Sequence, residues 1–188
     1  MICTACPRKC SAERSSRKLG FCRVPDDYVI SRAAPHFWEE PCISGEKGSG
    51  TIFFTGCNLG CIFCQNADIS RGGKGKTLSE DELIGEMHRL QDEGVHNINL
   101  VTPSHYAFRL AGTLKKAKLS VPVVWNSSGY DSVEALKALE ALNVLQTLQG
   151  SGTYLNDPTF SFLEFPFSLK LKNGTNIHDL IVARETVE

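Results

Sequence analysis

The sequence lacks the features that would point to a membrane or a polyanion as its partner. No stretch of its 188 residues approaches the roughly 20 consecutive apolar residues of a membrane span. Its 20 basic and 21 acidic residues leave a formal net charge of −1, so bulk electrostatics favours neither nucleic acid nor a membrane surface. The N-terminus also lacks an apolar signal region. We therefore expect a cytoplasmic protein, with no membrane partner and no nucleic-acid partner.

Cysteine is absent from the chain after residue 64, and all eight cysteines lie before that point. In a reducing compartment, thiols gathered in this way indicate metal ligands rather than disulfides. The uneven distribution places the metal chemistry in the N-terminal third. The length and ordinary composition predict one globular domain, or one domain with a small appendage.

The densest group of thiols is Cys57, Cys61 and Cys64, with the spacing Cys-x3-Cys-x2-Cys. The apolar run 51–55 precedes it and predicts a buried strand, and Phe63 would give the following loop an aromatic wall. Thiolates are soft ligands that suit iron–sulfur clusters and zinc. Three thiolates on a four-iron cluster leave one iron open to a small molecule, which is our preferred interpretation. The alternative is a structural zinc site with a fourth ligand from elsewhere.

A second group of thiols comprises Cys3, Cys6, Cys10 and Cys22. The segment that holds them is too short to bury a core, so a bound metal would supply its folding energy. Zinc and a second iron–sulfur cluster both remain open as occupants. Six basic residues lie among these cysteines, and they would offset thiolate charge, form a weak nucleic-acid patch, or make a solvated face, which we prefer. They are Arg8, Lys9, Arg14, Arg17, Lys18 and Arg23.

Two further residues are spare candidate ligands. His36 and Cys42 lie between the two cysteine groups. As isolated residues, they are more often packing or hydrogen-bonding groups than metal ligands, and we interpret them so.

Beyond the cysteines, apolar periodicity predicts alternating helices and strands. A helix begins after Ser79, with Glu82 completing a capping box, and ends at Gly94. Its predicted apolar face is Leu83, Ile84, Met87 and Leu90. The later predicted elements are a strand over 97–101, a helix from Ser104 to about Lys118, a strand over 121–125 and a helix over 132–142. In that last helix the predicted apolar side is Val133, Leu136, Leu139 and Leu142.

This order of elements is the βα repeat of an α/β protein with a parallel sheet. Ligands of such sheets bind beyond the carboxyl ends of the strands. The cysteine loop follows the first strand, Thr102-Pro-Ser-His105 follows the second, and Asn126-Ser-Ser-Gly-Tyr130 follows the third. The sequence therefore predicts that these three segments share one edge of the sheet.

The cysteine motif with Phe63 in its aromatic slot resembles that of the radical S-adenosylmethionine (SAM) enzymes. Five flanking stretches resemble the branch related to pyruvate formate-lyase activating enzymes, and the resemblance covers about residues 1–142. They are 36–45, 48–54, 64–66, 97–105 and 126–130. The resemblance implies a partial (βα) barrel, here with about three βα units. We divide the chain into a cysteine-rich segment (1–32), the N-terminal half of the core (33–142) and a divergent tail (143–188).

The resemblance also implies a mechanism. Cys57, Cys61 and Cys64 would bind three irons of a 4Fe–4S cluster, and SAM would chelate the fourth. Electron transfer from a reductant such as flavodoxin or ferredoxin would split SAM into methionine and a 5′-deoxyadenosyl radical, which abstracts a hydrogen atom. In this branch, the hydrogen comes from a glycine of a partner enzyme. The expected SAM contacts are Phe63 at the adenine, Thr102, Ser104 and His105 at the methionine end, and Asn126.

The end of the sequence leaves a rival hypothesis open. The residues after Leu142 are too few for three further βα units, because a βαβ unit takes about 30 residues or more. The alternating phenylalanines from Phe160 to Phe167 do not continue the pattern, and residues 149–153 predict a loop. The chain would then be a shortened, non-catalytic iron–sulfur or zinc protein. A weaker rival is a metal-stabilised RNA-binding module that uses the basic N-terminus.

Overall fold

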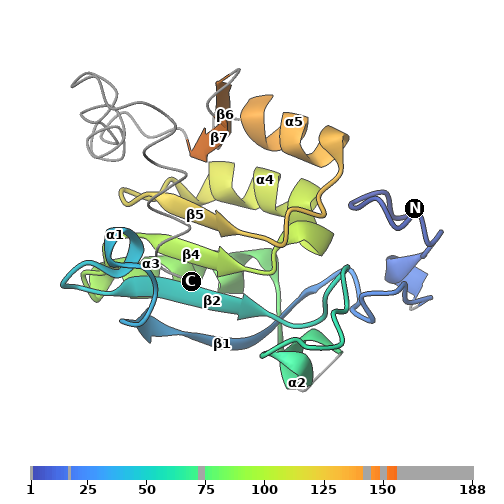
Figure 1. The fold of residues 1–188 in the computed structure, drawn as a ribbon, viewed down its shortest axis with the longest axis horizontal. Coiled ribbons are helices and arrows are strands. Elements are labelled where there is room, and N and C mark those ends of the chain that lie inside the picture. Colours follow the sequence, from blue (N-terminus) through green and yellow to red (C-terminus); the bar gives the residue numbers. More distant parts are fainter. Residues whose placement is uncertain (1, 17, 72–74, 142–144, 149–151, 156–188) are drawn as a thin grey trace, which may run out of the picture. The chain divides into compact units, whose positions relative to one another are not determined.

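A five-stranded sheet of order β3-β1-β2-β4-β5 forms the centre of the fold in the computed structural model (Figure 1). The structure describes residues 2–16, 18–71, 75–141, 145–148 and 152–155. The strands of the sheet are β1 (Tyr28–His36), β2 (Ser49–Phe54), β3 (Lys76–Leu78), β4 (Ile98–Val101) and β5 (Val123–Asn126). The sheet is open, with β3 and β5 at its edges.

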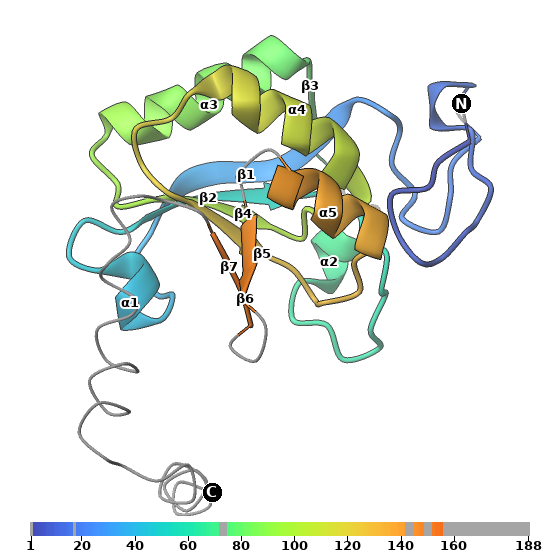
Figure 2. The same ribbon diagram turned by 90° about the horizontal axis from the view of Figure 1, so that it is seen from above.

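Helices and 3-10 turns lie before, between and after the strands of the sheet. The α-helices are α1 (Pro41–Ser44), α2 (Ala67–Ser70), α3 (Glu80–Asp92), α4 (Ala107–Ala117) and α5 (Val133–Ala141). Two 3-10 turns are η1 (Arg14–Ser16) and η2 (Ser104–Tyr106). Helices α3 and α4 pack against each other over one face of the sheet (Figure 2). In the part of the chain that the structure describes, no helix has the length and apolar character to cross a membrane.

The predicted parallel βα units are confirmed. β2 pairs in parallel with β4, and β4 pairs in parallel with β5. One register row joins Phe53, Val101 and Asn126 across the three strands. All three strands therefore end at the same edge, and the segments that follow them begin there.

The other half of the sheet differs from the prediction. The sequence predicts that residues 33–50 only lead into the first strand, whereas residues 33–36 belong to strand β1. β1 pairs antiparallel with both β2 and β3, so the sheet is mixed. The β1 sequence contains Pro35 and shows little apolar–polar alternation, so no local pattern predicts a strand there. Pairing with β2 and β3, which are distant in the sequence, stabilises it instead. The segment boundary between residues 32 and 33 falls inside this strand.

The main core lies between the helices and the sheet. Ile52, Phe54, Ile98 and Leu100 from the strands are at most 1% exposed and share one buried cluster with the inner face of α3. That face is Leu83, Met87 and Leu90, with Ile84 partly buried beside it, as predicted. The expected capping box is present: the Ser79 hydroxyl accepts from the Glu82 amide (3.2 Å), and the Glu82 carboxylate accepts from the Ser79 amide (2.8 Å). Gly94, at φ +85°, follows the helix end.

The later helices depart from prediction at their ends. Ser104 begins the 3-10 turn η2 instead of capping an α-helix, and α4 starts only at Ala107. The cause is the bend before it, where Thr102 takes φ +59° and Pro103 follows. In α5, the predicted apolar face is wrong at Val133, which is 61% exposed, because the helix instead turns Ala135 and Leu139 into the core.

Beyond α5, strands β6 (Leu145–Leu148) and β7 (Gly152–Leu155) form a separate antiparallel hairpin. The predicted loop over 149–153 is therefore wrong for its last two residues, which begin β7. Leu142 and the phenylalanines from Phe160 to Phe167 lie outside the described residues.

Candidate functional site

Three loops meet at the carboxyl edge of the parallel strands, as the sequence predicts. The Thr102 amide donates to the Asn126 carbonyl across a distance of 2.9 Å, which joins the loop after β4 to the end of β5. The Asn58 side-chain amide donates to the Tyr130 carbonyl at 2.7 Å, which joins the cysteine loop to the loop after β5. This edge is where open α/β sheets bind ligands.

The cysteine loop presents three half-buried thiols, Cys57, Cys61 and Cys64. The Leu59 amide donates to the Cys57 sulfur at 3.3 Å, and the Ser70 hydroxyl donates to the Cys64 sulfur at 3.5 Å. Cysteine thiolates are the usual ligands of iron–sulfur clusters. The chemistry of this donor set therefore fits an iron–sulfur cluster.

In the residues that the structure describes, no three acidic, histidine or cysteine side chains gather as they would around a single metal ion.

The tip of the cysteine loop is apolar and open to solvent. Ile62 is 91% exposed and Phe63 is 83% exposed. Adjacent large apolar side chains that are exposed in this way are typical of surfaces that cover a ligand or a partner. Phe63 lies in the loop as predicted, but no other part of the described structure buries its ring.

The loop after β4 is more buried than the sequence suggested. Ser104 and His105 are each 1% exposed, and the His105 Nε2 atom lies 3.0 Å from the Thr55 carbonyl. Burial, with the Arg14 charge nearby, lowers the pKa of His105 to about 3, so the ring is neutral at pH 7. Because a carbonyl can only accept, Nε2 carries the proton, and Nδ1 is a buried acceptor that has no hydrogen-bond partner in the described part of the chain.

The N-terminal cysteines share one neighbourhood. Burial raises the pKa of both Cys6 and Cys22, and the nearby thiols of Cys3 and Cys10 add to the shift of Cys6. Cys3 acts in the same direction on Cys22, and a methyl group added at Gly20 would lie only 2.6 Å from the Cys10 sulfur. Without metal, the thiol form of Cys6 and Cys22 is therefore favoured. The spare candidates lie apart: Cys42 is exposed in α1, and His36 ends β1 beside Phe53.

Of the six basic residues for which a solvated face is the preferred interpretation, Arg14 contradicts that interpretation, whereas Arg8 agrees with it. Arg14 is only 5% exposed, donates to the carbonyls of Pro25 and His105, and lies over the Tyr106 ring. Arg8 is exposed, but its guanidinium donates to two backbone carbonyls of the cysteine loop. The charge pattern could not reveal these contacts, because the acceptors are backbone atoms 11 to 91 residues away.

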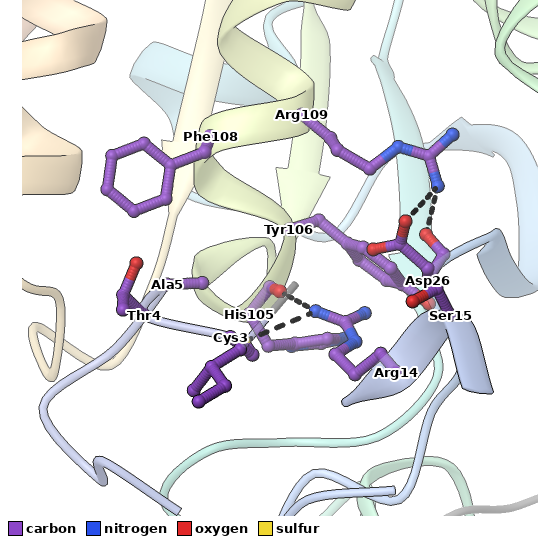
Figure 3. Close-up of a pocket in the computed structure, with 11 residues that line it drawn as sticks. Cys3, Thr4, Ala5, Arg14, Ser15, Asp26, His105, Tyr106, Phe108 and Arg109 are labelled. Atoms are coloured by element: carbon purple, nitrogen blue, oxygen red, sulfur yellow. Dashed lines mark hydrogen bonds and ion pairs between the residues drawn. The ribbon is translucent and has the colours of Figure 1, made fainter. Parts of the chain in front are cut away.

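A pocket of about 240 Å³ lies between the N-terminal segment and the start of α4 (Figure 3). Cys3 and Arg14 line it on one side, and His105, Phe108 and Arg109 line it on the other. Its lining includes none of the cysteines at 57, 61 and 64. The pocket is therefore distinct from the cysteine loop, although His105 borders both regions.

Comparison with known proteins matches the region that holds the loops. A family profile described as "Radical SAM superfamily" matches residues 51–164. An uncharacterised protein of Methanocaldococcus jannaschii is 32% identical over 142 residues, an alignment that covers 71% of this chain and 40% of the relative. The chain thus spans less than half the length of that relative. No solved structure matches.

Proposed function

The chain belongs to the radical SAM superfamily, and on that premise we propose that it binds a 4Fe–4S cluster through Cys57, Cys61 and Cys64 and cleaves SAM reductively. One observation carries the proposal. The thiols lie in the loop after β2, and that loop contacts the loop after β5 at the carboxyl edge of the sheet. A small molecule bound at the cysteines would therefore meet side chains from three strands.

A cluster in this loop would supply the electron that splits SAM into methionine and a 5′-deoxyadenosyl radical for hydrogen abstraction. The chain's own residues bind and orient SAM. Thr102 and Asn126 sit at adjacent strand ends, and Phe63 offers an exposed ring to the adenine. We propose that Ser104 and His105, both buried, shape the loop that contacts the methionine end of SAM.

The test is anaerobic reconstitution with iron and sulfide, followed by SAM and dithionite, with 5′-deoxyadenosine measured by chromatography. We expect product from the unaltered chain and none from Cys61→Ala. The matched control is Cys42→Ala, which removes an exposed thiol from α1 and should leave the yield unchanged. A bound cluster without product would favour a non-catalytic iron–sulfur protein, and product that does not require Cys61 would place the chemistry elsewhere.

We further propose the activating-enzyme branch, in which the radical removes a hydrogen atom from a backbone glycine of a partner protein. The support is the resemblance of the segments 36–45, 97–105 and 126–130 to that branch. Flavodoxin or ferredoxin would be the reductant. The measurement is electron paramagnetic resonance of candidate partners after incubation with the loaded chain and SAM. If every candidate partner remains without a glycyl radical signal, the branch assignment is wrong.

For the N-terminal cysteines, we propose a second metal site, with zinc or an iron–sulfur cluster as occupant. The support is that, beside burial, the thiols of Cys3 and Cys10 raise the pKa of Cys6, and those of Cys3 and Cys6 raise the pKa of Cys22. Metal content measured by mass spectrometry should fall in Cys22→Ser and stay constant in Cys42→Ser. Equal content in both variants would remove this site, and the first 32 residues would lose their proposed role as a metal-binding segment.

A further inference from the structure

Backbone carbonyls of the cysteine loop are held by arginines from outside the motif. Arg8 donates through Nε to the Asn58 carbonyl (2.7 Å) and through Nη2 to the Leu59 carbonyl (2.8 Å). Arg71 donates through Nη2 to the Cys61 carbonyl (2.9 Å). Three of the four carbonyls from residue 58 to residue 61 therefore accept a hydrogen bond from a guanidinium group. Arg8 and Arg71 together therefore hold the backbone between Cys57 and Cys61.

Aromatic side chains fix the direction in which Arg8 points. Its guanidinium carbon lies 3.7 Å from the centre of the Phe21 ring and 5.8 Å from that of Tyr130. Phe21 also packs against the loop itself, since a methyl group added at Gly60 would lie 3.0 Å from its ring. A planar guanidinium stacked on a ring keeps its donor fork in one orientation, which an ammonium group cannot do.

Asn58, the buried residue beside Cys57, links the cysteine loop to the N-terminal segment and to the loop after β5. Asn58 is 1% exposed, and its side chain bonds to both the Cys6 thiol and the Tyr130 carbonyl. Next to it, a methyl group added at Gly56 would lie 2.3 Å from the Cys22 carbonyl. The N-terminal segment thus packs directly on the start of the cysteine loop, and Arg8 is part of that interface.

We propose that Arg8 and Arg71 are positioning residues of the cluster site, which hold the Cys57–Cys61 backbone and raise the reduction potential of the bound cluster. This inference rests on the proposed function, because it presumes a cluster at Cys57, Cys61 and Cys64. Net charge and nearby dipoles set the potential of iron–sulfur clusters. Reduction adds one negative charge, which the permanent positive charges of two nearby guanidinium groups stabilise.

Because Arg8 and Arg71 are exposed, an effect on the cluster can be distinguished from an effect on the folding of the chain. Both side chains are exposed to solvent, where charged pairs and hydrogen bonds add little to the free energy of unfolding. Removing either group should leave the metal-free chain folded. Any effect should appear in the cluster, where outer-shell partners of metal ligands typically matter about tenfold or more.

The experiment compares four variants with the unaltered full chain after anaerobic reconstitution. Arg8→Gln and Arg71→Gln remove one charge and the carbonyl contacts, and Arg8→Lys keeps the charge without the fork. Lys9→Gln is the matched control, because Lys9 is exposed, adjacent to Arg8 and carries the same charge. Two quantities are measured: the iron retained per chain against a chelator, and the midpoint potential from a dithionite titration followed by electron paramagnetic resonance.

We expect Arg8→Gln and Arg71→Gln to retain the cluster about tenfold less tightly and to shift its midpoint potential to more negative values. Arg8→Lys should weaken retention while keeping the potential close to that of the unaltered chain. Lys9→Gln should match the unaltered chain in both quantities. The inference is overturned if Arg8→Gln and Arg71→Gln match Lys9→Gln. If the unaltered chain itself retains no iron that depends on Cys61, the proposed function fails instead.

Discussion

At the scale of single residues, His105 combines near-complete burial with a neutral ring. The folded state binds its proton only near pH 3, whereas the unfolded state binds it with the ordinary pKa of 6.5. The contribution to stability is therefore fully present above pH 6.5 and is lost as the pH falls toward 3. We predict a loss of roughly 3 to 5 kcal/mol over this range, measured by urea unfolding. The His105→Gln variant should show a smaller loss, and an equal loss would contradict the assignment.

Arg14 carries a second prediction at this scale. Its guanidinium satisfies the buried carbonyls of Pro25 and His105 and stacks on Tyr106. Arg14→Met would keep most of the packing but leave these carbonyls unpaired, at a cost of roughly 3 kcal/mol. Lys9→Met, an exposed neighbour in the same segment, should change the free energy of unfolding by less than about 0.5 kcal/mol. Thermal unfolding measures the loss of stability in both variants. Similar losses in Arg14→Met and Lys9→Met would show that the hydrogen bonds of Arg14 do not stabilise the fold.

At the scale of secondary structure, helix α3 is begun by the Ser79–Glu82 capping box. Ser79→Ala removes the hydroxyl that accepts the Glu82 amide, so it should destabilise the chain by about 1 kcal/mol. Ser128→Ala, in an exposed loop position, is the matched control and should be neutral. Chemical denaturation measures both. A neutral Ser79→Ala variant would mean that packing of α3 on the sheet alone determines where this helix begins.

The inner strand β4 carries an unusual polar group. Asn99 is 0% exposed, and neither polar atom of its carboxamide has a hydrogen-bond partner among the residues that the structure describes. A buried amide without partners costs about 1 to 3 kcal/mol, so Asn99→Leu should preserve or raise the free energy of unfolding. Asn97→Leu is the contrast, because its amide bonds to the Ile43 carbonyl and its oxygen to the Ser49 hydroxyl, and its loss should destabilise. A strongly destabilised Asn99→Leu variant would show that the amide is satisfied in solution.

At the scale of the whole molecule, the N-terminal segment and the cysteine loop meet at Gly56. This residue takes φ +81°, and an added methyl group would lie 2.3 Å from the Cys22 carbonyl. Gly56→Ala should therefore separate the two segments and lower both stability and retained iron. Gly94→Ala is the matched control, since Gly94 has φ +85° and open space around it, and it should cost only the backbone strain of about 1 kcal/mol. If Gly56→Ala and Gly94→Ala lower stability and retained iron equally, close packing of the N-terminal segment on Gly56 is not what matters.

The parallel half of the sheet is predictable from local sequence patterns. Apolar periodicity of 51–55 and of helix α3 reports local structure, and the repeat of strand and helix places three loops at one edge. The cysteine spacing pointed to the superfamily that the family profile then matched. These features are readable because residues close in sequence carry them.

Other features of the fold and the site depend on contacts between segments that are distant in the sequence. Strand β1 exists because β2 and β3 pair with it on both sides, and no local pattern records those partners. Arg14 lies among charges that we expect to be solvated, yet folding buries it against the His105 carbonyl, and folding brings the exposed Arg8 to the Asn58 carbonyl. His105 stood in a promising loop, but its burial, and with it its neutral state, depends on Thr55 and Arg14 from other segments. The physical reason is common to all three: burial, pairing and charge environment are properties of residues distant in sequence.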